Sequence, residues 1–236
     1  MGQRSQLYIR YKNKKNLVAM HLQWNYGYYM INRTYQLLDF VGKNAKADYS
    51  NFREEHFDIA NSDTRREDID MLQNLIQMNT TIGSYVKGID LVKEDYEWGI
   101  DKEDLKETFK MNPNFQDNNN GILVIDIQEN GKVKYGLSGG YEEVKNFEEF
   151  KMISAREYFR LSEESYDEEY KQYRLENSNK ELYDEVMKQI DYIENNFELL
   201  TDEEYKEIFD TEYKWEDCIK PKVLEELKEK RNKESV

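Results

Sequence analysis

The side chains that most often perform catalysis or bind transition metals are few and widely spaced in this sequence. A zinc site needs several cysteine or histidine ligands at short spacing. The chain has one cysteine, Cys218, and two histidines, His21 and His56. A nucleophilic pair of Cys218 with a histidine would require the fold to bring them together, and a small buried apolar residue is the simpler interpretation of Cys218. The sequence therefore predicts no zinc site.

Loops that bind phosphate groups or activate a serine also have recognisable sequences. The chain contains neither Gly-x-x-x-x-Gly-Lys-Ser/Thr nor Gly-x-Gly-x-x-Gly, and it has no Gly-x-Ser-x-Gly. Its glycine-rich segment, residues 136–140, matches none of these patterns. We therefore expect no cofactor, and the sequence alone does not disclose a reaction.

One carboxylate lies in a strand-like segment where a metal-dependent nuclease could place one. Asp126 follows an apolar run and is followed by Lys132 and Lys134. Such nucleases need clustered carboxylates, so that a metal and a base converge on one phosphate. The return segment, residues 132–137, has no acid, so we assign no metal site and expect Asp126 to face solvent. We keep a metal-dependent nuclease as an alternative function, ranked after the two binding functions described below.

The charges are distributed unevenly along the chain. The first 47 residues contain eight Lys or Arg and one acid, a net charge of +7, and the remainder contains 26 basic and 48 acidic residues, a net charge of −22; together they give −15. A division of this kind indicates a nucleic-acid or charged-protein partner. If the two regions instead pair within one fold, their charges cancel internally.

The acidic region suggests docking on a basic protein. A rigid surface dense in carboxylates can enter a groove built to hold phosphates, as a nucleic-acid mimic or inhibitor. The alternative is that acidic helices only keep the protein soluble. The acids that we expect to form this partner-binding face are Glu163, Glu164, Asp167, Glu168, Glu203 and Glu204. The expected partner is a basic protein that handles nucleic acid.

The basic N-terminal region supports an alternative function. Cations that bind phosphate are interleaved there with aromatic rings that can stack on bases, which is typical of RNA-binding and single-strand-binding surfaces. The residues that would bind RNA or single-stranded nucleic acid are Arg4, Arg10, Lys12, Lys14, Lys15 and Trp24. Tyr8, Arg10 and Lys12 alternate with apolar positions, so one face of this segment should present cations and a phenol to solvent.

Two β-hairpins are expected to position these groups. Residues 6–11 and 17–24 flank a turn-like Asn-Lys-Lys-Asn, and residues 122–127 and 132–137 flank Asn-Gly. Because residues 122–125 are continuously apolar, that strand should be covered on both faces. We predict an α+β fold with a small antiparallel sheet from two β-hairpins, packed helices and an acidic helical C-terminal half.

Helical spacing of apolar residues and capping boxes predict the helices. They are expected over residues 28–42, over 64–80, within 91–111, from Ser178 through Phe197, after Thr201, and over 223–231. The best candidate for a domain boundary lies near residue 140. It divides an α+β domain, residues 1–140 with the basic hairpin, from an acidic helical region, residues 141–236. The alternative is that both regions belong to the same domain.

The sequence gives some indication of the compartment. No apolar run approaches the roughly 18 residues needed to span a bilayer, and the first residues lack the apolar segment of a secretory signal. A single cysteine cannot form an internal disulfide, which agrees with a reducing compartment. We expect a cytoplasmic protein with no membrane partner.

The N-terminus resembles a known group of proteins. Met1-Gly2-Gln3-Arg4-Ser5-Gln6 with Tyr8 and Arg10, followed by Gln23-Trp24-Asn25-Tyr26-Gly27, is similar to the opening of small uncharacterised proteins of phages and mobile elements of Gram-positive bacteria. The resemblance covers about the first forty residues. It implies a setting of phage–host conflict, in which small acidic proteins often inhibit bacterial defence systems, including CRISPR systems. It assigns no catalytic residue.

Overall fold

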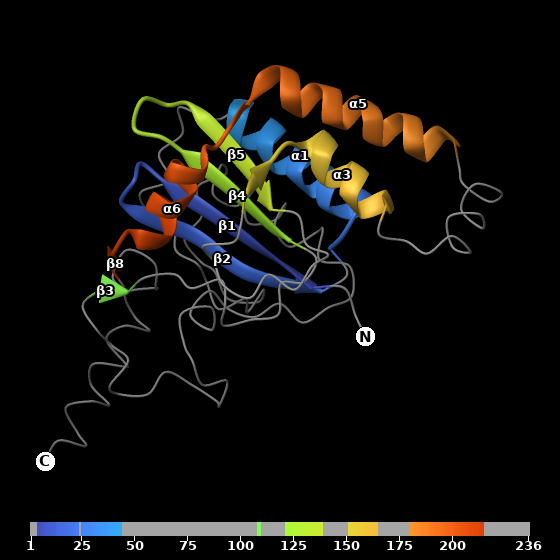
Figure 1. The fold of residues 1–236 in the computed structure, drawn as a ribbon. Helices are drawn as coiled ribbons and strands as arrows, with labels where there is room; N and C mark the ends of the chain where they lie inside the picture. Colours follow the sequence, from blue (N-terminus) through green and yellow to red (C-terminus); the bar gives the residue numbers. More distant parts are fainter. Residues whose placement is uncertain are drawn as a thin grey trace, which may run out of the picture.

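The structure is a computed structural model, and it describes residues 4–23, 25–43, 108–109, 121–138, 151–164 and 180–214. These residues form both helices and strands, so the fold class is α+β, as predicted. The strands build a central sheet, which has helices on both faces (Figure 1).

The first two strands, β1 (Arg4–Tyr11) and β2 (Lys15–Gln23), pair in antiparallel fashion. Between them, Lys12 and Asn13 have φ angles of 51° and 59°, and the amide of Lys14 donates to the carbonyl of Tyr11. Two successive positive φ values match a type I′ turn, whose twist fits that of the flanking strands.

The strands β4 (Ile122–Ile127) and β5 (Val133–Ser138) form a second antiparallel pair, and Gly131 has a φ of 80° in the turn between them. The order in the sheet is β2-β1-β4-β5-β6, with β6 spanning Met152–Ile153; β7 (Glu198–Leu199) also pairs with β5. The pairs β1–β4 and β5–β7 are parallel. The sheet is therefore mixed rather than antiparallel, because the connections to β4 and β7 return the chain in the same direction.

Three helices cover one face of the sheet: α1 (Tyr28–Lys43), α3 (Ala155–Glu164) and α5 (Lys180–Asn196) (Figure 1). Their apolar stripes join alternate residues of the strands in one core. This core includes Leu7, Ile9, Leu38, Leu123, Ile125, Tyr135, Tyr158, Phe159, Ile190 and Ile193. Residues from both sides of the predicted boundary near residue 140 share it.

The opposite face is covered by α6 (Asp202–Asp210). Beyond α6, β8 (Tyr213–Lys214) pairs with β3 (Thr108–Phe109) in a separate two-stranded sheet. The second core consists of Tyr8, Ile122, Val124, Met152, Leu200, Tyr205, Ile208, Phe209 and Tyr213. All six residues of β4 are buried between the two cores, which confirms that this strand is covered on both faces.

Of three further predicted helices, one is wrong at Phe109 and two cannot be compared with the described residues. Phe109, placed on a helix within residues 91–111, lies instead in β3 opposite Tyr213. That pairing joins residues about a hundred positions apart, so local spacing could not reveal it. The helices predicted over 64–80 and 223–231 lie outside the described residues.

Candidate functional site

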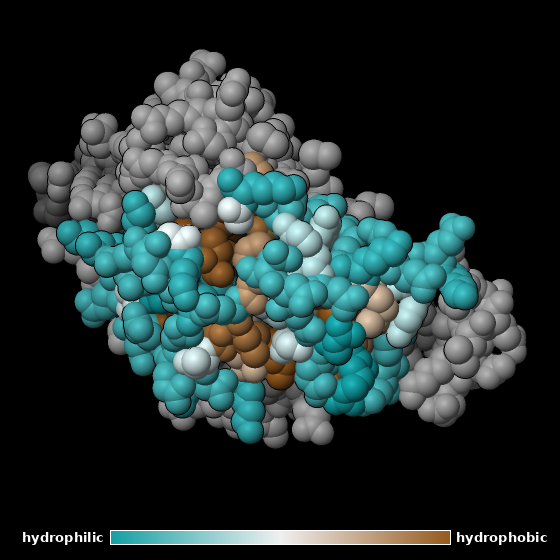
Figure 2. All heavy atoms as spheres, turned by 90° about the horizontal axis from the view of Figure 1, so that it is seen from above, coloured by the Kyte–Doolittle hydropathy of each residue, from teal (hydrophilic) through white to brown (hydrophobic). Residues whose placement is uncertain are grey.

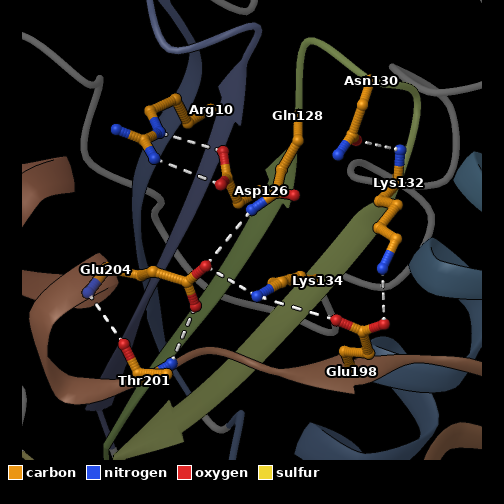
Figure 3. A network of polar contacts seen from close by, with 9 residues as sticks. All are labelled: Arg10, Asp126, Gln128, Asn130, Lys132, Lys134, Glu198, Thr201 and Glu204. Atoms are coloured by element: carbon orange, nitrogen blue, oxygen red, sulfur yellow. Dashed lines mark hydrogen bonds and ion pairs between the residues drawn. The ribbon is translucent and has the colours of Figure 1, made fainter.

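Three charged side chains form a row across the face of the sheet beneath α6. In the strand register Arg10 of β1 lies opposite Asp126 of β4, which lies opposite Lys134 of β5. Because side chains alternate between the two faces of a strand, all three point away from the first core. We call Arg10, Asp126 and Lys134 the polar row (Figure 3).

The Arg10–Asp126 pair is buried and bidentate. Arg10 Nε donates to Asp126 Oδ1 at 2.9 Å and Nη2 donates to Oδ2 at 3.1 Å, and the two side chains are 3% and 0% exposed. Burial disfavours the charge on Arg10, but the hydrogen bonds to Asp126 outweigh it and raise the pKa of Arg10. The expectation that Asp126 faces solvent is wrong, because α6 covers this face.

Lys134 connects the row to two acids beyond the sheet. Its Nζ donates to Glu204 Oε1 at 2.6 Å and lies 3.7 Å from Glu198 Oε2, and Lys132 Nζ lies 2.8 Å from Glu198 Oε1. The hydrogen bond to Glu204 raises the pKa of Lys134, and the bond from Lys132 lowers the pKa of Glu198. These contacts join β5 to β7 and α6 (Figure 3).

The N-terminus of α6 is fixed by a capping box, as its sequence predicts. Thr201 Oγ1 accepts from the amide of Glu204 at 3.2 Å, and Glu204 Oε2 accepts from the amide of Thr201 at 3.0 Å. The carboxylate of Glu204 therefore satisfies the helix end with one oxygen and binds Lys134 with the other.

The apolar side of α6 is packed by aromatic rings. Phe209 meets Tyr8 of β1 edge to face, with 4.9 Å between ring centroids, and Tyr205 lies 4.8 Å from Phe209. The Tyr213 hydroxyl donates to the carbonyl of Ile208 at 2.7 Å, which ties β8 to the end of the helix. The orientation of α6 on the sheet is thus fixed by both apolar and ionic contacts.

The outer side of α6 is strongly acidic. Five acids and one lysine in nine residues give the helix a charge of −4. Asp202 accepts from the amide of Met152, and Glu207, which is 59% exposed, lies 3.3 Å from Arg10. Glu203 is exposed and has no ion pair within the described residues. Glu203, Glu207 and Asp210 share one helix face, because they are spaced by four and three residues.

Arginines neutralise part of the acid on the opposite side of the molecule. Arg156 of α3 binds Asp191 and Glu194 of α5, and Arg160 binds Glu157 and Glu164 within α3. These bonds raise the pKa of both arginines, with Glu157 making the largest contribution for Arg160.

The surface on the α5 side is mainly hydrophilic, with hydrophobic side chains visible in gaps between polar ones (Figure 2). Leu182 and Tyr183, near the start of α5, are 41% and 51% exposed.

The six acids predicted to bind a partner do not form one surface within the described residues. Glu163, partly buried, and Glu164, exposed, lie on α3, which packs on the first face of the sheet; Glu203 and Glu204 lie on α6, on the opposite face. Asp167 and Glu168 lie outside the described residues. The prediction omitted Asp202, Glu207 and Asp210, which the density of acids after Thr201 could have revealed.

The predicted nucleic-acid face is covered at some of its described residues and exposed at others. Tyr8 and Arg10 were expected to face solvent, but they are 0% and 2% exposed beneath α6. Lys12 and Lys14 are exposed in the β1–β2 turn, and Lys14 Nζ lies 3.6 Å from Glu129 Oε1. The side chains of Arg4 and Lys15, and the whole of Trp24, lie outside the described part of the chain.

A further cation of the basic region is also buried. Arg33 is 2% exposed and donates through Nε to Asn25 Oδ1 at 2.9 Å, while Asn25 donates to Ser5 Oγ at 3.0 Å. Burial lowers the pKa of Arg33 to about 10. Two of the cations counted in the basic region, Arg10 and Arg33, therefore belong to the interior and do not add to an exposed positive patch.

Within the described ranges, no three His, Cys, Asp or Glu side chains are grouped so that they could hold a metal ion. Both oxygens of Asp126 are engaged by Arg10. No helix of the described part is long and apolar enough to cross a bilayer.

Comparisons with protein-family models, with curated proteins and with solved structures found no match for this chain.

Proposed function

We propose that this chain is a phage-type accessory protein with an anti-defence role, which acts by binding in the host cytoplasm. Its acidic surface docks on a basic host protein that handles nucleic acid and competes there with the nucleic acid. The observation that carries the proposal is α6, a nine-residue helix that contains five acids and is anchored to the sheet.

Anchoring matters because a docking surface that is already ordered loses less conformational entropy when it binds. The capping box holds the first turn of α6, Lys134 binds Glu204, and Tyr8 packs against Phe209. Along the helix axis, Glu203 and Glu207 are about 6 Å apart and Glu203 and Asp210 about 10 Å apart. This row of carboxylates offers fixed negative charges to a groove that binds phosphates.

The acids on α3 and α5 support the proposal less well. Glu164, Asp191 and Glu194 already bind arginines of α3, so part of their field is cancelled within the molecule. On α6, Glu204 and Glu207 contact cations of the sheet, while Glu203 is exposed without such a contact in the described structure. We therefore place the docking surface on α6.

Two double variants with equal charge change test this assignment. Glu203→Lys/Asp210→Lys alters α6, and Glu163→Lys/Glu164→Lys alters α3; each raises the net charge by four, two units at each of two positions. Immobilised protein is exposed to the heparin-binding fraction of a Gram-positive bacterial lysate, and duplex DNA is then added as competitor.

The wild type and the α3 variant should capture basic proteins that DNA displaces, and the α6 variant should lose them. Equal capture by the α6 variant and the wild type would refute the docking surface. Capture that DNA does not displace would refute competition with nucleic acid.

The alternative, RNA or single-strand binding, retains Lys12 and Lys14 as exposed cations, and Lys12 Nζ lies 4.8 Å from the centroid of the Tyr11 ring. Arg10 cannot contribute, because it is buried against Asp126. A filter-binding titration with a polynucleotide checks this function, since phosphate contacts would make the affinity fall with increasing salt.

A further inference from the structure

The parallel pairing of β1 with β4 has no turn to fix its register. In β1–β2 and β4–β5 a short turn determines which residues lie opposite each other. β1 and β4 are instead far apart in the sequence, and Arg10 and Asp126 are 116 positions apart. Their alignment must therefore be selected by side-chain contacts.

Apolar contacts alone select this alignment weakly. β4 is buried on both faces, and β1 is buried from Ser5 to Tyr11. A shift of two residues keeps each side chain on its own face of the sheet, so apolar residues would still meet apolar residues. The hydrophobic pattern therefore tolerates such a shift.

The Arg10–Asp126 ion pair, in contrast, does not tolerate a shift of two residues. A shift by two in one direction sets Arg10 opposite Val124 and Asp126 opposite Lys12, and a shift in the other direction sets Arg10 opposite Gln128 and Asp126 opposite Tyr8. In both arrangements the buried guanidinium of Arg10 no longer lies opposite a carboxylate, and the loss of the ionic partner of a buried charge is strongly unfavourable.

We propose that the Arg10–Asp126 pair is a register key: it selects the native alignment of β1 with β4 out of alignments that apolar burial would also accept. Because Asp126 lies opposite Lys134 in the β4–β5 hairpin, the same pair also aligns Lys134 with Arg10 of β1. The inference does not depend on the proposed function.

Stability alone is a poor explanation for this pair. Buried ion pairs replaced by apolar residues of similar size often leave stability unchanged or increase it. A pair kept for specificity behaves differently when both partners are replaced, since the fold keeps its burial and loses its discrimination between registers.

The test uses the full chain with Arg10→Met/Asp126→Leu, which removes both charges and retains apolar volume. Uniformly labelled protein is analysed by NMR for contacts between backbone protons of β1 and β4, which place Leu7 beside Leu123 and Ile9 beside Ile125 in the native register. The matched control is Arg160→Met/Glu164→Leu, which removes an exposed pair on α3.

The wild type and the control should give one set of β1–β4 contacts. The Arg10→Met/Asp126→Leu variant should keep its circular dichroism and give at least two sets, one of them shifted by two residues. A single native set in this variant overturns the register key. Unfolding of the variant overturns it as well, because the pair would then supply stability rather than selection.

Discussion

Replacing only one partner of the buried pair should be far more damaging than replacing both. Asp126→Leu removes both carboxylate oxygens that Arg10 binds at 2.9 and 3.1 Å. Among the acids of the described residues, the guanidinium, 3% exposed, would keep only Glu207, which lies 3.3 Å away and is mostly in solvent. The variant therefore leaves a buried cation without a buried counter-charge.

The expected loss is about 3–5 kcal/mol of the free energy of unfolding, the range for breaking a buried ion pair from one side. With a urea m value of about 2 kcal/mol/M, the unfolding midpoint should fall by about 2 M. Total stabilities of domains are about 5–15 kcal/mol, so the variant can remain folded at low temperature.

Urea unfolding followed by circular dichroism measures this loss, with Glu164→Leu on α3 as the control. Glu164 also binds an arginine, but both side chains are largely exposed, so this control should lose much less. Adding Arg10→Met to Asp126→Leu should recover most of the stability. A loss under about 1 kcal/mol in Asp126→Leu alone would refute the reasoning, since values of that size are typical of exposed pairs.

Three further predictions concern the elements around the polar row. Gly121→Ala should be less stable than Gly131→Ala by about 1–3 kcal/mol in urea unfolding: both glycines have positive φ, but only at Gly121 would a Cβ lie 2.4 Å from a backbone oxygen of β5; equal losses would contradict this. Burial alone would raise the pKa of Glu204, but the hydrogen bond from Lys134 outweighs this effect and lowers the pKa. The Glu204–Lys134 ion pair therefore stabilises the fold above the ordinary glutamate pKa of 4.5, and this stabilisation is lost as the pH falls below that value. Glu204→Gln should therefore be less stable than the wild type at pH 7 and approach it in acid unfolding curves, whereas a constant difference would count against the ion pair. Phe209→Ala should lose about 3–5 kcal/mol in thermal or urea unfolding, because the ring is 3% exposed; a loss under about 1 kcal/mol would mean that the ring is not part of the core.

Local patterns predicted the elements that depend on local physics. The continuous apolar run before Asp126 correctly indicated a strand buried on both faces. The Thr201 box correctly indicated the start of α6, and apolar spacing after Tyr28 correctly indicated α1. In each case the residues that decide the structure lie within one element or its cap.

The candidate site depends on contacts that no local pattern contains. Arg10 and Glu207 are 197 positions apart, so the alternation that suggested a solvent-exposed cation in β1 could not show that α6 covers it. The same limit separates the predicted acids, because sequence proximity says nothing about which face of the sheet a helix covers. Charge composition identified the acidic region, and only the fold distinguishes α6 from α3.

The most direct test of the docking surface is the salt dependence of binding to a fluorescent oligo-arginine peptide, a surrogate for a basic groove. Affinity is measured at several salt concentrations for the wild type, for Glu203→Lys/Asp210→Lys and for Glu163→Lys/Glu164→Lys. We predict that the α6 variant loses about tenfold or more in affinity, or 1.4 kcal/mol, and shows a shallower salt dependence, while the α3 variant stays close to the wild type. Equal losses in the two variants would contradict the account, because binding would then follow net charge and not a surface on α6.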